Sequence, residues 1–174
     1  RVRRADVWVD GPAIRSVGAA AGAATRIDCS GCLVMPGLVV GHTHLYGTLA
    51  RGMSAPAHAP RGFVEILERV WWKLDKALDA RAIADSASAG AIEALRSGVT
   101  TIVDHHASPR AVDGSLDLVA GAVNAVGLRL IGCYEVSDRD GAAVRDAGLR
   151  ENERFSRIDR PLARCGPGGP AAPR

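Results

Sequence analysis

Two histidines separated by a single residue, His42 and His44, carry the clearest chemical signal in the sequence. They follow a nearly continuous apolar run, LVMPGLVV, at residues 33–40. In a strand, residues two apart project to the same side, roughly 6.5–7 Å apart along the chain. Two imidazoles so placed can share one metal ion at bonds of about 2.0–2.1 Å. The spacing therefore indicates a metal-binding pair, although a lone His-x-His also arises by chance.

Three further side chains could contribute to a site near this pair. His105 and His106 follow Asp104 at the end of a β-branched segment, VTTIVD. Adjacent strand residues point to opposite sides, so at most one of the two histidines should face a pocket, as a substrate contact or a partner of a metal ligand. Both could instead be polar loop residues. Arg51 could hold an anionic substrate group, or it could be an ordinary surface arginine.

Cys29 and Cys32 form a C-x-x-C spacing ahead of the histidines. A structural zinc site with two cysteines and two histidines fits poorly, because finger-type histidine pairs leave three to five residues between them. A redox pair would need a helix N-terminus after a strand, whereas Ser30 and Gly31 indicate a turn. We therefore expect two small buried side chains. Four cysteines make no disulfide framework in 174 residues, which favours reduced thiols and the cytoplasm.

The elements that would position these residues alternate between strands and helices. Short strands and turns are expected in residues 5–35, within the segments ADVWVDG, AIRSVG and TRIDCSG. The apolar run at 33–40 suits a strand buried on both faces. Further strands are expected at 99–104 and 127–136, and helices at 63–78, from the cap Asp79 to Gly98, from 113 or 115 to 126, and at 141–155. This rhythm predicts an α/β fold with a parallel sheet or barrel.

Net charge and the lengths of the apolar runs limit the kinds of partner that the chain can bind. The 174 residues carry 22 basic and 19 acidic side chains, a net charge of +3 that is too weak and dispersed for a nucleic-acid surface. No apolar run reaches the roughly 18–20 residues of a membrane span. No leader is visible, and the chain opens as if cut from inside a longer protein. The expected partner is a small-molecule substrate, and a homo-oligomer is left open.

The segment from 28 to 53, DCSGCLVMPGLVVGHTHLYGTLARGM, resembles the opening of the amidohydrolase superfamily. Two later segments, RVWWKLDKALD and SGVTTIVDHHASP, are similar to the SsnA-type aminohydrolases linked to selenium metabolism, near the chlorohydrolases and guanine deaminases. The resemblance implies a partial β-sandwich at 1–35 and about the first three βα units of a (β/α)8 TIM-type barrel at 36–155. Residues 156–174 are expected to form an irregular Pro/Gly-rich tail that could be out of frame.

By this resemblance, His42 and His44 are ligands of Zn²⁺ or another divalent metal such as Fe²⁺. The metal would activate water to hydrolyse a carbon–nitrogen bond, not a peptide bond, in a small cyclic substrate. The family takes further ligands from the fifth, sixth and eighth strands, and His58, His105 and His106 do not match those positions. The catalytic acid–base group is therefore unknown. Two alternatives remain: an inactive fragment, or a non-enzymatic metal-binding or interaction module.

Overall fold

The computed structural model describes residues 2–18 and 25–166. The chain divides into two compact units, Arg1–Pro36 and Gly37–Arg174, one residue away from the boundary expected between 35 and 36. No helix among the described residues is both long and apolar enough to cross a membrane.

The first unit contains one antiparallel hairpin, β1 (Val7–Asp10) with β2 (Ala13–Val17). Gly11 adopts a φ of 56° in the connecting turn, where a side chain would be strained. The third strand expected within residues 25–31 does not form. A turn from Cys29 to Cys32 takes its place, and the Asp28 carboxylate stabilises it by accepting the N–H of Ser30 at 2.9 Å. The described part of the expected β-sandwich is thus a hairpin.

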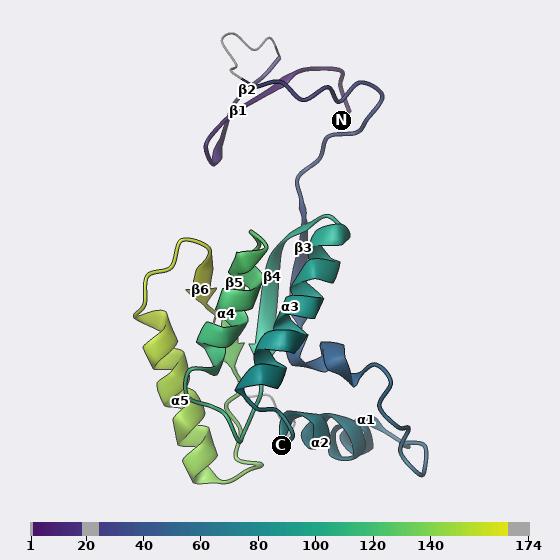
Figure 1. The fold of residues 1–174 in the computed structure, drawn as a ribbon, viewed down its shortest axis with the longest axis vertical. Helices are drawn as coiled ribbons and strands as arrows, with labels where there is room; N and C mark the ends of the chain where they lie inside the picture. The colour runs from purple at the N-terminus through teal and green to yellow at the C-terminus, as the bar shows by residue number, and fades with distance from the viewer. Residues whose placement is uncertain (1, 19–24, 167–174) are drawn as a thin grey trace. The chain divides into compact units, whose positions relative to one another are not determined.

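The second unit is built on a parallel sheet with the strand order β3-β4-β5-β6 (Figure 1). Its strands are β3 (Leu38–Thr43), β4 (Val99–His106), β5 (Arg129–Tyr134) and β6 (Ala163–Cys165). They are connected through α3 (Ala80–Arg96), α4 (Ser115–Ala125) and α5 (Ala142–Ser156). Consecutive parallel strands joined by helices are the repeating unit of a (β/α)8 barrel, so the predicted α/β fold class is confirmed.

The crossover from β3 to β4 carries additional helices. It includes a 3₁₀ segment (η1, Leu45–Ala50), then α1 (Phe63–Ile66), a π-helical segment (η2, Leu67–Trp71) and α2 (Trp72–Asp75). The single helix expected at 63–78 is therefore interrupted by a wider turn and ends three residues early. The predicted cap is confirmed, because the Asp79 carboxylate accepts the N–H of Ala82 at 2.8 Å. Gly98 follows the end of α3 with a φ of 79°.

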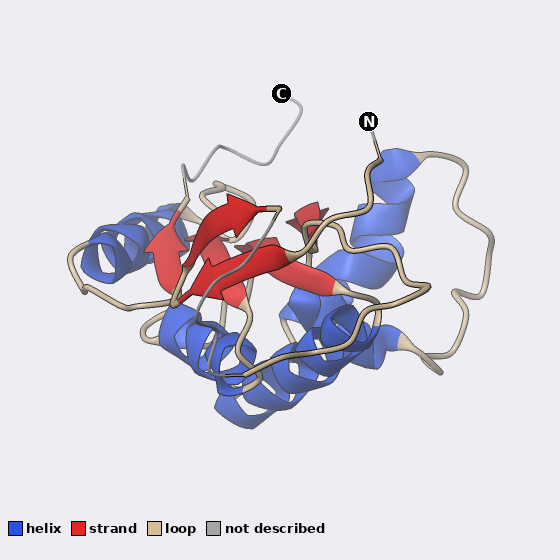
Figure 2. Ribbon diagram, turned by 90° about the horizontal axis from the view of Figure 1, so that it is seen from above, coloured by secondary structure: helices blue, strands red, loops and turns tan. Residues whose placement is uncertain are grey.

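The sheet has two unlike faces. On one face of the sheet, the strands contact α3, α4 and α5 (Figure 2). This covered face includes Ile102, Asp104 and His106, which are all buried. The open face carries the alternate side chains Val39, Thr101, Val103, His105 and Ile131. Ile102 on the covered face is 1% exposed, whereas Ile131 on the open face is 36% exposed. Helices thus bury one side of the sheet within the described residues.

This asymmetry corrects the expectation that the first long strand is buried on both faces. β3 is the edge strand of the sheet, and its Leu38 and Val39 are 49% and 63% exposed. The strand also starts later than the apolar run. Pro36 has no N–H to donate to a neighbouring strand, and Gly37 lies so close to Thr100 that a Cβ at this position would overlap its side chain.

The segment expected to be an irregular tail also differs from the prediction. β6 pairs in parallel with β5, and the N–H of Leu130 donates to the carbonyl of Leu162 at 2.8 Å. Backbone N–H and C=O groups form these hydrogen bonds whatever the side-chain pattern. The Pro- and Gly-rich pattern of this segment therefore did not predict the strand. The barrel segment therefore continues through Cys165 rather than ending at 155. Residues 167–174 of the expected tail lie outside the described residues.

Candidate functional site

The two histidines converge at the carboxyl end of β3. Their Nε2 atoms are 3.1 Å apart, and the rings meet edge to face. The pairing of β3 with β4 shifts register between Val40 and Thr43, and Thr43 pairs with Asp104. The two histidines flank Thr43 and therefore project to the side opposite Asp104. The prediction that His42 and His44 share a face is confirmed, and their metal role stays a prediction.

The backbone of β4 fixes the orientation of His44. Its Nδ1 lies 2.8 Å from the carbonyl oxygen of His105. A carbonyl can only accept, so Nδ1 carries the proton and Nε2 presents its lone pair towards His42. This is the tautomer that a metal ligand needs, and such a hydrogen bond commonly orients ligating histidines. The carbonyl of His105 thus fixes both the tautomer and the orientation of His44.

The donor set fits a divalent metal but does not complete a site. Two imidazole nitrogens bound to one zinc ion, each at about 2.0–2.1 Å, must lie within about 4 Å of each other, and these two do. Across residues 2–18 and 25–166, no group of three or more His, Cys, Asp or Glu side chains is arranged to hold a metal ion. The described residues therefore offer a pair of ligands, fewer than the three that a catalytic zinc usually takes from protein.

Two aromatic side chains enclose His44. Tyr46 and Trp71 lie with ring centroids 5.8 and 5.6 Å from the imidazole, and 5.8 Å from each other. Gly47 makes room for Trp71, since a Cβ there would stand 2.9 Å from the indole. Burial raises the pKa of the Tyr46 hydroxyl well above its usual range, so it stays protonated. Trp71 therefore packs directly against the imidazole ring of His44.

The adjacent residues His105 and His106 have different surroundings, as the strand alternation predicts. His105 is half-buried, with its ring centroid 5.5 Å from that of His44, and burial lowers its pKa. His106 lies on the covered face with 0% exposure, and its Nε2 is 3.0 Å from the Ser108 hydroxyl. Burial lowers the pKa of His106 to about 3, so it is neutral and belongs to the core. His105 is therefore the candidate for a pocket contact.

Asp104 is a contributor that the sequence reasoning missed. Its side chain is fully buried, and Oδ1 accepts the N–H of Leu45 at 2.7 Å, directly after His44. Burial raises its pKa to about 7. Among the described residues, Oδ2 has no hydrogen-bond partner. Asp104 thus ties the start of the η1 segment to β4, and the only sequence signal for it was an acidic residue in a β-branched run.

Arg51 and His58 lie elsewhere. The Arg51 guanidinium forms a two-pronged ion pair with Glu93 on α3, at 2.5 and 2.6 Å. Glu93 neutralises the charge that an anionic substrate group would need, which favours the surface-arginine alternative. His58 is exposed, and its backbone carbonyl accepts from Arg69 at 3.0 Å.

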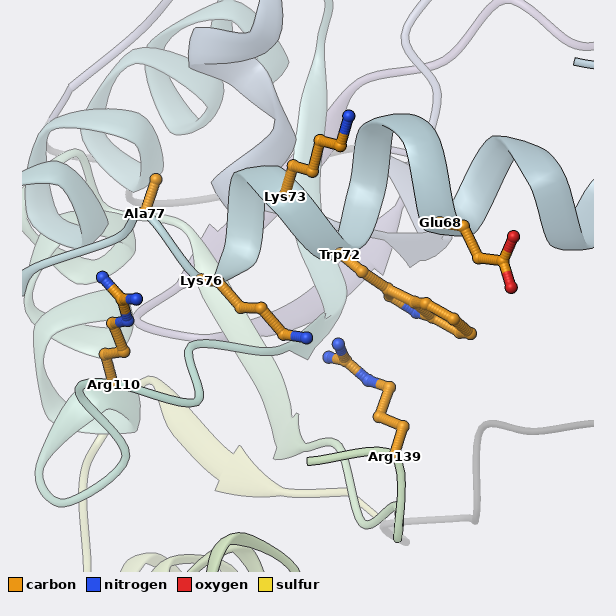
Figure 3. Close-up of a pocket in the computed structure, with 7 residues that line it drawn as sticks. All are labelled: Glu68, Trp72, Lys73, Lys76, Ala77, Arg110 and Arg139. Atoms are coloured by element: carbon orange, nitrogen blue, oxygen red, sulfur yellow. The ribbon is translucent and has the colours of Figure 1, made fainter. Parts of the chain in front are cut away.

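An open pocket lies among segments that follow the carboxyl ends of β3, β4 and β5 (Figure 3). Its lining is rich in cations: Lys73, Lys76, Arg110 and Arg139, together with Glu68, Trp72 and Ala77. Arg139 pairs with Asp75, Glu135 and Asp140 at 2.7, 2.8 and 3.0 Å. Lys76 pairs with Asp140 at 2.7 Å. These carboxylates compensate much of the positive charge, so the network mainly fixes the loops around the site.

Comparison with known proteins identifies the family and the fold. The sequence model of the Amidohydrolase family matches residues 33–164. The chain is 32% identical over 165 residues to a 5-methylthioadenosine/S-adenosylhomocysteine deaminase of Pyrococcus furiosus, a match covering 91% of this chain and 37% of that protein. It is 30% identical over 135 residues to an 8-oxoguanine deaminase of Pseudomonas aeruginosa, covering 75% and 29%. In structure, it resembles atrazine chlorohydrolase TrzN from Arthrobacter aurescens complexed with zinc, with a TM-score of 0.65, 20% identity, and coverage of 95% and 42%.

These matches define a class of hydrolases with an α/β-barrel fold. The chain belongs to the amidohydrolase family. It spans well under half the length of the relatives that it matches. The family match runs on to residue 164, so the alternative that the segment after 155 is out of frame does not hold for residues 156–164.

Proposed function

We propose that this chain contributes the first pair of metal ligands to a metal-dependent amidohydrolase. The reaction is deaminase-type hydrolysis of a carbon–nitrogen bond, not a peptide bond, in a small cyclic substrate. One observation carries the proposal: the Nε2 atoms of His42 and His44 lie 3.1 Å apart while the His105 carbonyl holds the proton of His44 on Nδ1. The relatives named above act, by their names, on purine derivatives and a triazine, which supports a nitrogen-rich ring as substrate.

Each residue of the proposed site has a separate role. His42 and His44 would hold Zn²⁺ or Fe²⁺, which supplies Lewis acidity and activated water at neutral pH. The His105 carbonyl sets the tautomer of His44. Tyr46 and Trp71 limit the rotation of its ring by packing against it. The acid–base group and the remaining ligands belong to βα units beyond β6 in a complete barrel, and an SsnA-type aminohydrolase of the cytoplasm is the specific version that we propose.

Zinc affinity of the 174-residue chain tests the ligand pair. We expect one weakly bound Zn²⁺ per chain, measured by competition with a chromophoric chelator. His42→Ala and His44→Ala should each weaken binding at least tenfold, since each removes one of two direct ligands. His58→Ala is the matched control, because it removes an exposed imidazole outside the site and should leave affinity unchanged. If the double variant His42→Ala/His44→Ala bound Zn²⁺ as tightly as the parent chain, the two histidines would not be the zinc ligands.

Turnover separates the enzyme from its alternatives. Ammonia release from guanine-like and triazine-like substrates should be undetectable with the chain alone and added Zn²⁺, because two ligands and four strands do not close a shaped pocket. Metal binding with turnover would show that these residues suffice as an enzyme. Metal binding without turnover fits a contributor to a larger site or a metal-binding module. A chain that shows neither metal binding nor turnover fits the inactive fragment.

A further inference from the structure

The turn at Cys29–Cys32 holds two thiols that the proposed hydrolase does not use. Both cysteines are exposed, whereas Cys133 is buried and Cys165 is partly buried. The expectation of two small buried side chains was therefore wrong. No helix or strand within the described residues 25–36 covers this turn, which explains the exposure.

The backbone brings the two cysteines within bonding reach. The N–H of Cys32 donates to the carbonyl of Cys29 at 3.0 Å, which closes a four-residue turn. Gly31 has a φ of 76°, the value that the third position of a type II turn requires. Such a turn keeps its first and fourth Cα atoms within about 7 Å, and disulfides span Cα separations of about 4.4–6.8 Å.

A second hydrogen bond holds the turn from its N-terminal side. The Asp28 carboxylate accepts the N–H of Ser30 at 2.9 Å. Hydrogen bonding to Ser30, through its side chain first and its N–H second, lowers the pKa of Asp28. The carboxylate therefore stays ionised and keeps the hydrogen bond at neutral pH. Asp28 and Gly31 together preorganise the loop, so closing a ring between the two cysteines requires little further ordering of the backbone.

We propose that Cys29 and Cys32 are a thiol-modification site that forms a reversible intramolecular disulfide by exchange with low-molecular-weight disulfides such as glutathione disulfide. The thiolate of one cysteine attacks the external disulfide, and one glutathione thiolate leaves and takes up the proton that the cysteine lost. The other cysteine then attacks the mixed disulfide and displaces the second glutathione in the same way. Two protein thiols are oxidised to one disulfide, and one external disulfide is reduced to two thiols.

The remaining cysteines serve as internal comparisons. Burial raises the pKa of Cys133 to about 11, so it holds little of the reactive thiolate at neutral pH. Burial also raises the pKa of the partly buried Cys165. Exchange should therefore select the turn at Cys29–Cys32 over the thiols of the second unit.

Intact-mass spectrometry of the 174-residue chain tests the proposal. The metal-free chain is incubated with glutathione disulfide, quenched with acid and alkylated. We expect the loss of two free thiols, no retained glutathione, a Cys29–Cys32 link in the peptide map, and full reversal by dithiothreitol. Cys29→Ser should instead retain glutathione at Cys32. Cys133→Ser, which leaves the turn intact, should form the link like the parent chain.

A turn variant distinguishes preorganisation from mere proximity in sequence. Gly31→Val strains the positive φ and should lower the equilibrium ratio of closed disulfide to mixed disulfide at least tenfold. Three results would overturn the proposal: a parent chain with two stable glutathiones, a disulfide between two chains, or cysteines that stay reduced under conditions that modify Cys29→Ser.

Discussion

The two faces of β4 show how one strand serves both a core and a site. Ile102, Asp104 and His106 on the covered face are fully buried, while His105 on the open face is half-buried beside His44. His105 and His106 are consecutive and chemically identical, yet His105 faces His44 and His106 faces the core. Their position relative to the helices, rather than their residue type, decides which one is available for chemistry.

The largest expected contrast between the faces is in stability. Ile102→Ala should lower the free energy of unfolding by about 2–5 kcal/mol, because it leaves a cavity in the core on the covered face. Val103→Ala, one residue later on the open face, should cost about 1 kcal/mol or less, since its methyl groups keep contact with solvent. Urea denaturation followed by circular dichroism measures both. Equal losses would mean that the open face is packed as tightly as the covered one.

The buried His106 should make stability depend on pH. It accepts a proton near its ordinary pKa of 6.5 in the unfolded chain, but only near pH 3 when folded. The stability gained by keeping it neutral is therefore complete above pH 6.5 and is lost as the pH falls from there towards 3. His106→Gln keeps a partner for Ser108 but does not titrate. The free energy of unfolding of this variant should therefore fall less steeply with pH than that of the parent chain, by up to about 1.4 kcal/mol per pH unit.

Urea titrations of the parent chain and His106→Gln at half-unit steps from pH 7 to 5 measure this difference. His58→Gln is the matched control, because it makes the same replacement at an exposed side chain. Parallel slopes for the parent chain and His106→Gln would show that His106 titrates normally in the folded state.

The open face should also promote self-association. Val39 lies on the edge strand with 63% exposure, on the same face of the sheet as Ile131, and an unpaired edge can recruit another chain. We expect the isolated chain to associate, and Val39→Lys to raise the dissociation constant about tenfold by placing a charge on the edge. Sedimentation velocity over a concentration series measures this. A monomeric parent chain throughout the series would contradict the prediction.

The smallest effect is expected for Arg51. Its ion pair with Glu93 is solvent-exposed, and such pairs add little to stability. Arg51→Gln should leave the melting temperature unchanged, and it should also leave zinc affinity unchanged if the arginine serves the surface alone. A loss of zinc affinity in Arg51→Gln would instead indicate that Arg51 contributes to the site.

Local patterns in the sequence predicted what depends on local geometry. The cap at Asp79, the stop at Gly98 and the shared face of His42 and His44 follow from helical and strand periodicity. The bonds that orient the site were not predictable in this way. The contacts of His44 with the His105 carbonyl and of Leu45 with Asp104 join residues 61 and 59 positions apart.

Exposure was also beyond the reach of the sequence pattern. The apolar run before β3 could not show that the strand forms a sheet edge, and the C-x-x-C spacing could not show that both of its cysteines are exposed. β6 was missed because a three-residue strand has no period to detect, and its place depends on pairing with β5.

The long separation between His44 and His105 also has a kinetic consequence. β4 and β5 pair across 28 residues, as between Thr101 and Arg129, whereas β3 reaches β4 only after a loop of 61 residues closes. Each doubling of loop length adds about 0.6 kcal/mol of closure entropy, so the β4-α4-β5 unit should nucleate folding and β3 should dock later. The histidine pair would then assemble after the folding transition state, and a bound ion would slow unfolding of the chain rather than accelerate its folding.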